Sequence, residues 1–139
     1  MRRTTIALAL ATTFVLTACG TGQIGDGGGT RSDSLALITG MRGEPFYVSI
    51  ECAAKEQAAK AGVELNAQAP EQFEQAEQAR ILNSMAGAQP GAIIIAPTDD
   101  KALATPLQQA KDNGVEIVEV DTALQDRSIA KASLSSDNY

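Results

Sequence analysis

The chain has 139 residues, of which 44% are hydrophobic, 20% charged and 4% aromatic, with 17 acidic against 11 basic residues. This length suits one domain, and the acidic balance argues against a nucleic-acid-binding surface, which needs clustered Lys and Arg. The chain has no histidine and two cysteines, so histidine catalysis and zinc sites of the usual Cys/His spacing are excluded.

The N-terminal segment has the pattern of an export signal. Arg2 and Arg3 precede an apolar run over residues 6–16, which is too short to span a bilayer. The run ends in Leu-Thr-Ala-Cys, with Cys19 last, and this resembles the lipobox of bacterial lipoproteins. The resemblance implies cleavage after residue 18 and a diacylglycerol on the Cys19 thiol, whose two acyl chains give stable membrane attachment where one chain alone would bind only marginally. The alternative is an ordinary secretory signal in which Cys19 is incidental.

The segment 20–33, GTGQIGDGGGTRSD, contains six glycines in fourteen residues. Such a composition cannot bury apolar surface and behaves as a flexible coil. A glycine-rich phosphate loop is the alternative, but no strand precedes the segment and it contains no GK[ST] or GxGxxG pattern. We therefore predict a lipidated Cys19 followed by a tether, with the folded domain covering residues 34–139.

The domain opens with an apolar strand at Ser34–Thr39 and a loop at Gly40–Glu44. Pro45 suits the first turn of a helix that ends at Gly62. The apolar positions of this helix predict a buried stripe that includes Cys52, and the charged positions give (i, i+4) pairs on a solvated face. The predicted stripe consists of Val48, Ile50, Cys52, Ala53 and Ala59, and the pairs are Glu51–Lys55 and Glu56–Lys60.

A second, weaker strand is expected at Val63–Ala67, and Pro70 is expected to open a polar helix over residues 71–87. The glutamines and glutamates of this helix are expected to face water. Its apolar side chains could face a sheet, and they are Phe73, Ala76, Ile81 and Met85.

Ala92–Ala96 is the most apolar stretch after the leader and predicts a central parallel strand buried on both faces. Thr98 or Asp99 is the expected N-cap of a helix running to Asn113, with Gly114 as the stop. Two further strands are predicted at Val115–Val120 and Ile129–Leu134, separated by a loop.

The resulting order βαβαβαββ predicts an α/β fold with a doubly wound parallel sheet in flavodoxin-like order and right-handed crossovers. In such sheets ligands bind outside the carboxyl ends of the strands. The candidate site therefore comprises the loops that follow the strands, namely Gly40–Tyr47, Pro97–Asp100, Asp121–Gln125 and Ser135–Tyr139.

Four short motifs at these strand ends resemble the periplasmic sugar-binding proteins of ABC importers, in the ribose- and galactose-binding, LacI-like branch. They are Glu44-Pro45-Phe46-Tyr47, the segment Ile94 to Asp99, Val120-Asp121, and Ser136-Asp137-Asn138. The resemblance covers residues 34–139 and implies one lobe of a type I periplasmic-binding-protein fold.

The resemblance also implies roles for individual residues. Phe46 and Tyr47 match the aromatic pair that stacks on a sugar ring; the alternative is that both are helix-start residues packed on the sheet. Asp121 matches the acid that accepts hydrogen bonds from sugar hydroxyls, with a turn or cap aspartate as the alternative. Asp137 and Asn138 match a segment at the hinge, where they help to order the crossover, unless they form a plain turn.

Two departures from the family leave the identity of the sugar open. Thr122 stands where several relatives place an arginine, and Glu44 stands where an asparagine often lies. Arg42 could supply the missing donor from the first loop, although a solvated loop arginine is the alternative. Relatives also have a second lobe and a returning strand and helix beyond the position of Tyr139, so we expect the first lobe alone to bind sugar weakly or undetectably.

The expected function is that of an extracytoplasmic substrate-binding lipoprotein in the cell envelope, which delivers a sugar-like small molecule to an ABC permease. We expect a lipid-anchored monomer with no cofactor, no metal, no nucleic-acid partner and no catalysis. The alternative is an enzyme on a similar fold that uses the carboxylates Asp99, Asp100 and Asp121. Transcription regulators and signalling receivers of this fold are excluded by the export signal.

Overall fold

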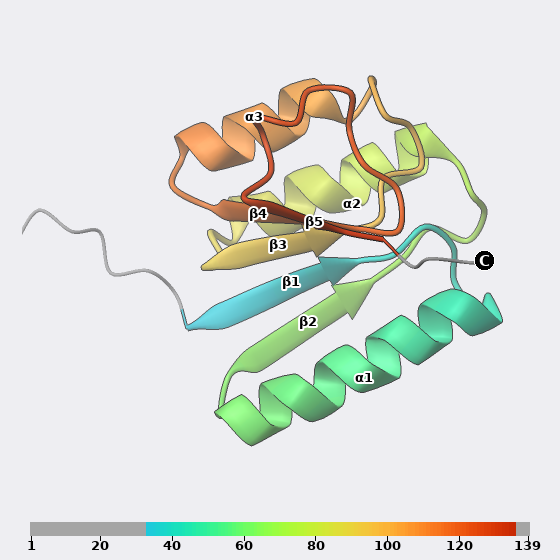
Figure 1. Cartoon of the computed structure of the whole chain (residues 1–139), viewed down its shortest axis with the longest axis vertical. Helices are drawn as coiled ribbons and strands as arrows, with labels where there is room; N and C mark the ends of the chain where they lie inside the picture. The colour runs from blue at the N-terminus through green and yellow to red at the C-terminus, as the bar shows by residue number, and fades with distance from the viewer. Residues whose placement is uncertain (1–32, 136–139) are drawn as a thin grey trace, which may run out of the picture.

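The computed structural model describes residues 33–135 and shows a five-stranded sheet of order β2-β1-β3-β4-β5 (Figure 1). All neighbouring strands are parallel. The elements are β1 (Ser34–Ile38), α1 (Pro45–Ala61), β2 (Glu64–Gln68), α2 (Gln75–Gly87), β3 (Ala92–Ile95), α3 (Ala104–Asp112), β4 (Glu116–Val120) and β5 (Ala132–Leu134). The predicted α/β class, the element order and the flavodoxin-like strand order are confirmed.

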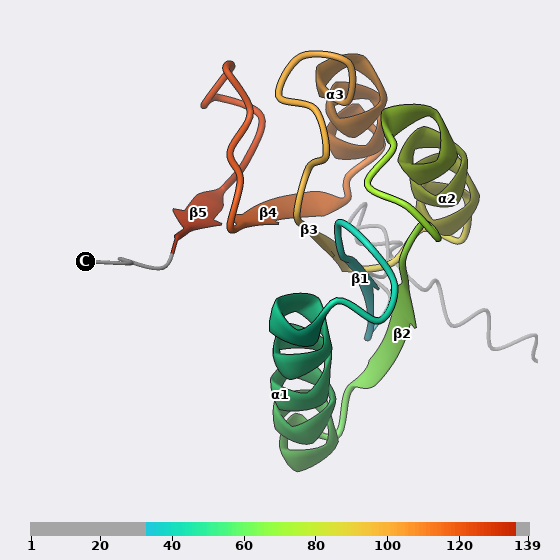
Figure 2. The same ribbon diagram turned by 90° about the vertical axis from the view of Figure 1, so that its right-hand side faces the viewer.

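The helices cover the two faces of the sheet unequally (Figure 2). α2 and α3 lie on one face, and α1 lies on the other, against β2. The main core forms between the sheet and the α2/α3 layer, where Ile93, Ile95 and Ile117 are almost completely buried. Ile94 of the central strand is only half-buried on the α1 side. The prediction that β3 is buried on both faces was therefore wrong for the α1 face, since α1 is the one helix of residues 33–135 on that side.

The ends of α1 follow the local signals of the sequence. Pro45 occupies the first helical turn, and the Glu44 carboxylate caps the helix by accepting a hydrogen bond from the backbone N–H of Tyr47 at 3.1 Å. Gly62 ends the helix in the left-handed conformation with φ 69°, which a residue without a Cβ adopts at low cost. On the exposed side Lys55 pairs with Glu51 at 2.5 Å, as predicted.

The buried face of α1 differs from the predicted one. Tyr47 and Ala58 are buried, whereas Val48 and Cys52 are exposed. Cys52 is therefore not the small core residue that the sequence predicted. The helix is rich in alanine, so several of its faces have similar hydrophobicity, and the large ring of Tyr47 decides which face turns inward.

Helices α2 and α3 begin later than predicted. Residues 71–74 form a turn, and α2 starts at Gln75 because the Glu74 carboxylate accepts hydrogen bonds from the N–H groups of Ala76 and Glu77. Asp99 likewise caps a turn rather than α3, through the N–H groups of Lys101 and Ala102. In both cases an acidic side chain a few residues after a loop proline accepts hydrogen bonds from the backbone N–H groups two and three residues further on.

The strand β5 is shorter than predicted. Residues 129–131 belong to the loop that joins β4 to β5, and Ile129 is nevertheless buried at 3% exposure. Its apolar side chain packs against the core from a loop, which explains why the sequence alone suggested a strand there.

Candidate functional site

The loops at the carboxyl edge of the sheet bring Tyr47 and Asp121 into contact. Tyr47 is the third residue of α1, and Asp121 follows the last residue of β4. The Tyr47 hydroxyl donates a hydrogen bond of 2.9 Å to Oδ2 of Asp121. Asp121 has φ 66°, a left-handed conformation that aspartate tolerates better than most residues, and it turns the chain sharply at the strand end.

The environment of Tyr47 keeps its phenol protonated. Burial is the largest cause that raises its pKa far above the ordinary value, and the hydrogen bond to Asp121 and the negative charges of Asp121 and Glu44 act in the same direction. Tyr47 is 7% exposed. Its hydroxyl therefore serves as a hydrogen-bond donor to Asp121, and its ring has little free face on which a ligand could stack.

Phe46 offers the exposed aromatic face beside this pair. It is 41% exposed, and its ring centroid lies 5.4 Å from that of Tyr47 in an edge-on arrangement. The structure thus brings Phe46, Tyr47 and Asp121 together at the carboxyl edge of the sheet, where they form a rim. Of the two aromatic residues predicted to stack, Phe46 has the accessible surface.

A further aromatic residue, Phe73, lies at the same rim. A Cβ added to Gly40 would lie 2.6 Å from the Tyr47 hydroxyl and 2.8 Å from Cε2 of Phe73, so both rings border Gly40. Phe73 is 53% exposed in the turn before α2. The prediction that Phe73 lies inside a helix and could face the sheet was wrong, because α2 begins only at Gln75.

A buried glutamine holds the ends of β1 and β3 together. Gln78 of α2 is fully buried, and its Nε2 donates to the carbonyl oxygens of Thr39 and Ala96 at 3.1 and 2.8 Å. Its Oε1 accepts hydrogen bonds from the N–H and the hydroxyl of Thr98 at 2.8 and 2.9 Å. The expectation that the glutamines of this helix face water was wrong for Gln78. Its spacing from Leu82 and Met85 on one helical face was the available sequence signal.

The charged residues of the first loop have local partners. Glu44 caps α1, as described above. Arg42 pairs with Glu71 at 2.9 Å and donates to the Ala69 carbonyl, and both charged side chains are largely exposed. These contacts join the β1–α1 loop to the β2–α2 loop. Thr122, beside Asp121, is half-buried, and its N–H donates to the carbonyl of Val120.

A pocket lies beside Tyr47, but it does not bring Phe46, Tyr47 and Asp121 together. It is lined by Thr39, Arg42, Tyr47 and Gln68 among others, and neither Phe46 nor Asp121 contributes to it.

The predicted ligand residues Asp137 and Asn138 and the predicted lipidation site Cys19 lie outside the described residues. Across residues 33–135, no group of three Cys, Asp or Glu side chains is placed to hold a metal ion, and no helix is long and apolar enough to cross a bilayer.

Comparisons with known proteins agree with this architecture. The model of a periplasmic binding protein domain family matches residues 35–139. An ABC transporter solute-binding protein from Agrobacterium vitis, bound with α-D-tagatopyranose, is 31% identical with a TM-score of 0.71, over 76% of this chain and 38% of that one. No curated protein sequence matches the chain.

Two further solved structures are similar. One is an ABC transporter solute-binding protein from Burkholderia multivorans, with an unknown ligand interpreted as α-D-erythrofuranose. It is 27% identical with a TM-score of 0.65, over 73% of this chain and 36% of that one. The other is the binding component of the arabinose ABC transporter from a Shewanella species, 24% identical with a TM-score of 0.68, over 75% and 35% of the two chains. The chain thus covers less than two-fifths of each solved protein's length.

Proposed function

Because the chain belongs to the periplasmic binding protein domain family, we propose that the whole protein is an extracytoplasmic substrate-binding protein of an ABC importer. It binds a sugar or a similar polar small molecule between two lobes, and residues 34–139 belong to the first. The 31% identity to the tagatopyranose-bound protein supports a sugar as the substrate class. The protein performs no catalysis, and its partner is a membrane permease.

The contact between Tyr47 and Asp121, with Phe46 at its side, is the observation that carries this proposal. A carboxylate has about four lone-pair sites, so Asp121 can accept the Tyr47 hydroxyl and sugar hydroxyls at the same time. The exposed ring of Phe46 supplies a face on which the apolar C–H groups of a sugar pack. Acceptor and stacking surface thus meet at the carboxyl edge, where ligands of doubly wound folds bind.

The neighbouring residues support the same site. Phe73 adds a second exposed ring on the β2–α2 loop. Glu44 and Arg42 hold the first loop in place and line the approach to the ligand site. Asp137 and Asn138 supply polar groups near the crossover to the second lobe. Closure of the second lobe over the rim excludes water from the ligand.

The N-terminal segment determines where the protein acts. The leader of residues 1–18 exports the chain, lipid on Cys19 anchors it to the outer side of the membrane, and residues 20–33 form the tether. We propose that the protein acts as a monomer.

An NMR titration tests the binding site directly. Amide shifts of the chain are followed while D-tagatose or L-arabinose is added to millimolar concentration. We expect weak binding, with shift changes centred on Phe46, Tyr47 and Asp121. Asp121→Asn should weaken the apparent affinity by roughly tenfold through loss of a charged acceptor.

Asp112→Asn serves as the matched control for this titration. Asp112 is an exposed aspartate at the end of α3, one residue before the Asn113 C-cap, and its substitution should leave the shift changes as in the parent. Absence of shift changes with either sugar, or changes centred away from the carboxyl edge, would argue against sugar binding at this rim.

A further inference from the structure

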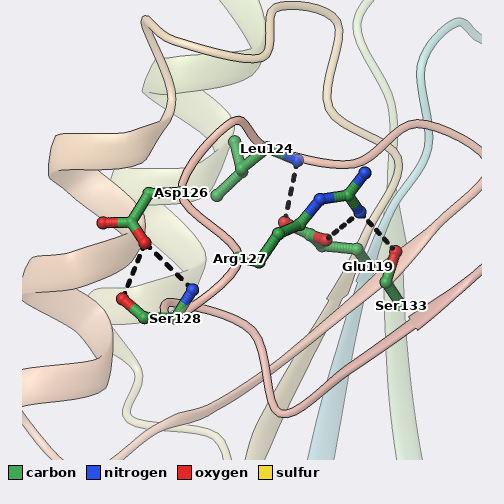
Figure 3. Close-up of polar contacts among 6 residues, drawn as sticks. All are labelled: Glu119, Leu124, Asp126, Arg127, Ser128 and Ser133. Carbon is green, nitrogen blue, oxygen red and sulfur yellow. Dashed lines mark hydrogen bonds and ion pairs between the residues drawn. The ribbon is translucent and has the colours of Figure 1, made fainter.

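Glu119 is a carboxylate buried inside the main core. It lies on β4 two residues after Ile117, so both side chains point to the layer of α2 and α3, and it is 0% exposed. Its Oε1 accepts a hydrogen bond of 3.0 Å from the N–H of Leu124 (Figure 3). Its Oε2 accepts no hydrogen bond from any residue in the described part of the chain, and Arg127 Nη1 lies 4.0 Å from it.

The bond to Leu124 closes the turn that carries Asp121. The backbone from Glu119 to Leu124 and the Glu119 side chain form a closed ring through this hydrogen bond. Asp121, with φ 66°, is one of the residues whose backbone makes up the ring. The N–H of Asp121 donates to the Leu134 carbonyl of β5 at 2.8 Å. Leu124 itself is 1% exposed, which fixes the far end of the ring in the core.

Arg127 adds a second connection from the same carboxylate. Its Nη1 also lies 3.5 Å from the hydroxyl oxygen of Ser133, to which it donates (Figure 3). Glu119 of β4, Arg127 of the loop and Ser133 of β5 are therefore linked. The loop between the two strands contains no helix, and it contacts the core through Leu124 and Ile129 in addition to these polar groups.

A buried charge is costly unless hydrogen bonds and counter-charges compensate for it, and an apolar residue of similar size is often tolerated or stabilising at such a position. The neighbouring core positions of β3 and β4 are isoleucines. The carboxylate at position 119 therefore needs an explanation other than core packing, and the N–H of Leu124 provides one.

We propose that Glu119 is a positioning residue for Asp121. Its buried carboxylate holds the 119–124 turn in the shape that presents the Asp121 side chain to Tyr47 and to the ligand rim. The consequence for ligand binding rests on the proposed function, whereas the effect on the turn does not.

Amide hydrogen exchange measured by NMR, without any sugar, tests the proposal. Glu119→Met replaces the acceptor with an apolar side chain of similar length, and Glu119→Gln keeps an acceptor oxygen. We expect the Leu124 and Asp121 amides to exchange roughly tenfold faster or more in Glu119→Met. They should stay near the parental rates in Glu119→Gln, and Ile93 should stay protected in both.

The global stability of each variant is measured in parallel by urea unfolding. Glu119→Met replaces a buried carboxylate with an apolar side chain, so its global stability need not fall below that of the parent. A positioning role predicts faster exchange of the turn even when the global stability is unchanged. Unchanged exchange at Leu124 and Asp121 would overturn the proposal. An equal increase at all amides of the sheet would also overturn it, since that pattern indicates a role in the core alone.

The parental chain provides a test that depends on no variant. If Glu119 holds the turn, the Leu124 amide is protected to a degree similar to the amides of β4. Exchange of this amide at the rate of an exposed loop would overturn the proposal, even where Glu119→Met fails to fold. Glu64→Met, at an exposed position of β2, is the control for the substitution itself. Because no ligand is present, failure of the sugar titration leaves this result unaffected.

Discussion

The Tyr47 hydroxyl and Oδ2 of Asp121 lie 2.9 Å apart although the residues are 74 positions apart in the chain. Tyr47 follows β1 and Asp121 follows β4, so their hydrogen bond spans the position of β3 between those strands. The bond fixes the start of α1 relative to the end of β4, and Phe46 lies beside it. The rim of the proposed site is therefore held by its own polar groups before any ligand binds.

Asp121→Asn should lower the pKa of Tyr47. Burial, the largest cause of the elevation, remains, so the pKa should stay above the ordinary value of about 10 while falling below that of the parent. In a Tyr139→Phe background Tyr47 is the single tyrosine, and its phenolate absorbance is followed with rising pH alongside circular dichroism. An identical titration in Asp121→Asn and the parent would contradict the assigned contact.

The raised pKa of Tyr47 also predicts how stability depends on pH. Because the pKa is higher in the folded chain than in the unfolded one, the stabilisation is fully present below about pH 10 and is lost as the pH rises beyond it. Urea unfolding at increasing pH should show a steeper decline for the parent than for Asp121→Asn. Asp112→Asn should follow the parent.

Gly40→Ala should destabilise the rim. Its new Cβ would lie 2.6 Å from the Tyr47 hydroxyl, which the hydrogen bond to Asp121 prevents from moving freely. We expect the free energy of unfolding to fall by about 1–3 kcal/mol, as in overpacked cores. Gly87→Ala, in α2 with nothing within 4 Å of the new Cβ, should instead be neutral or stabilising. Urea unfolding of both variants checks this, and equal stability of the two would contradict it.

Gln78→Leu should destabilise the chain more than a surface substitution on the same helix. It removes four hydrogen bonds and leaves the carbonyls of Thr39 and Ala96 without their amide donor. The expected loss is at least about 2 kcal/mol of unfolding free energy, since unpaired buried groups cost about 1–3 kcal/mol each. Gln75→Leu, at an exposed position of α2, is the control. A loss no larger than that of the control would contradict the assigned role.

Cys19→Ser should release the protein from the membrane. The lipobox resemblance predicts that lipid is attached to the Cys19 thiol, and serine provides no thiol for that attachment. Metabolic labelling with a fatty acid should mark the parent, and the membrane fraction should retain it. The variant should be unlabelled and soluble outside the cell membrane, whereas labelling of Cys19→Ser would contradict the lipoprotein prediction.

Local signals in the sequence predicted the order of the elements, both ends of α1 and the set of loops at the carboxyl edge. Pro45 and Gly62 act through their own backbone preferences, and the apolar run Ala92–Ala96 marks a central strand whatever its neighbours are. Parallel strands then place Tyr47 and Asp121 at one edge. For these features residues close in sequence carry the necessary information.

Tertiary contacts decided which face of α1 is buried and why Gln78 and Glu119 lie in the core. They also decided that Tyr47 is buried while Phe46 is exposed. A glutamine in a polar helix and a glutamate in a strand look solvated by composition, and their partners Ala96 and Leu124 lie in loops whose position follows from the whole sheet. Polar groups in a core are stable only where such distant partners meet them. The sequence alone therefore determined the frame and the edge of the site, and folding decided which side chains hold that edge and which remain exposed to a ligand.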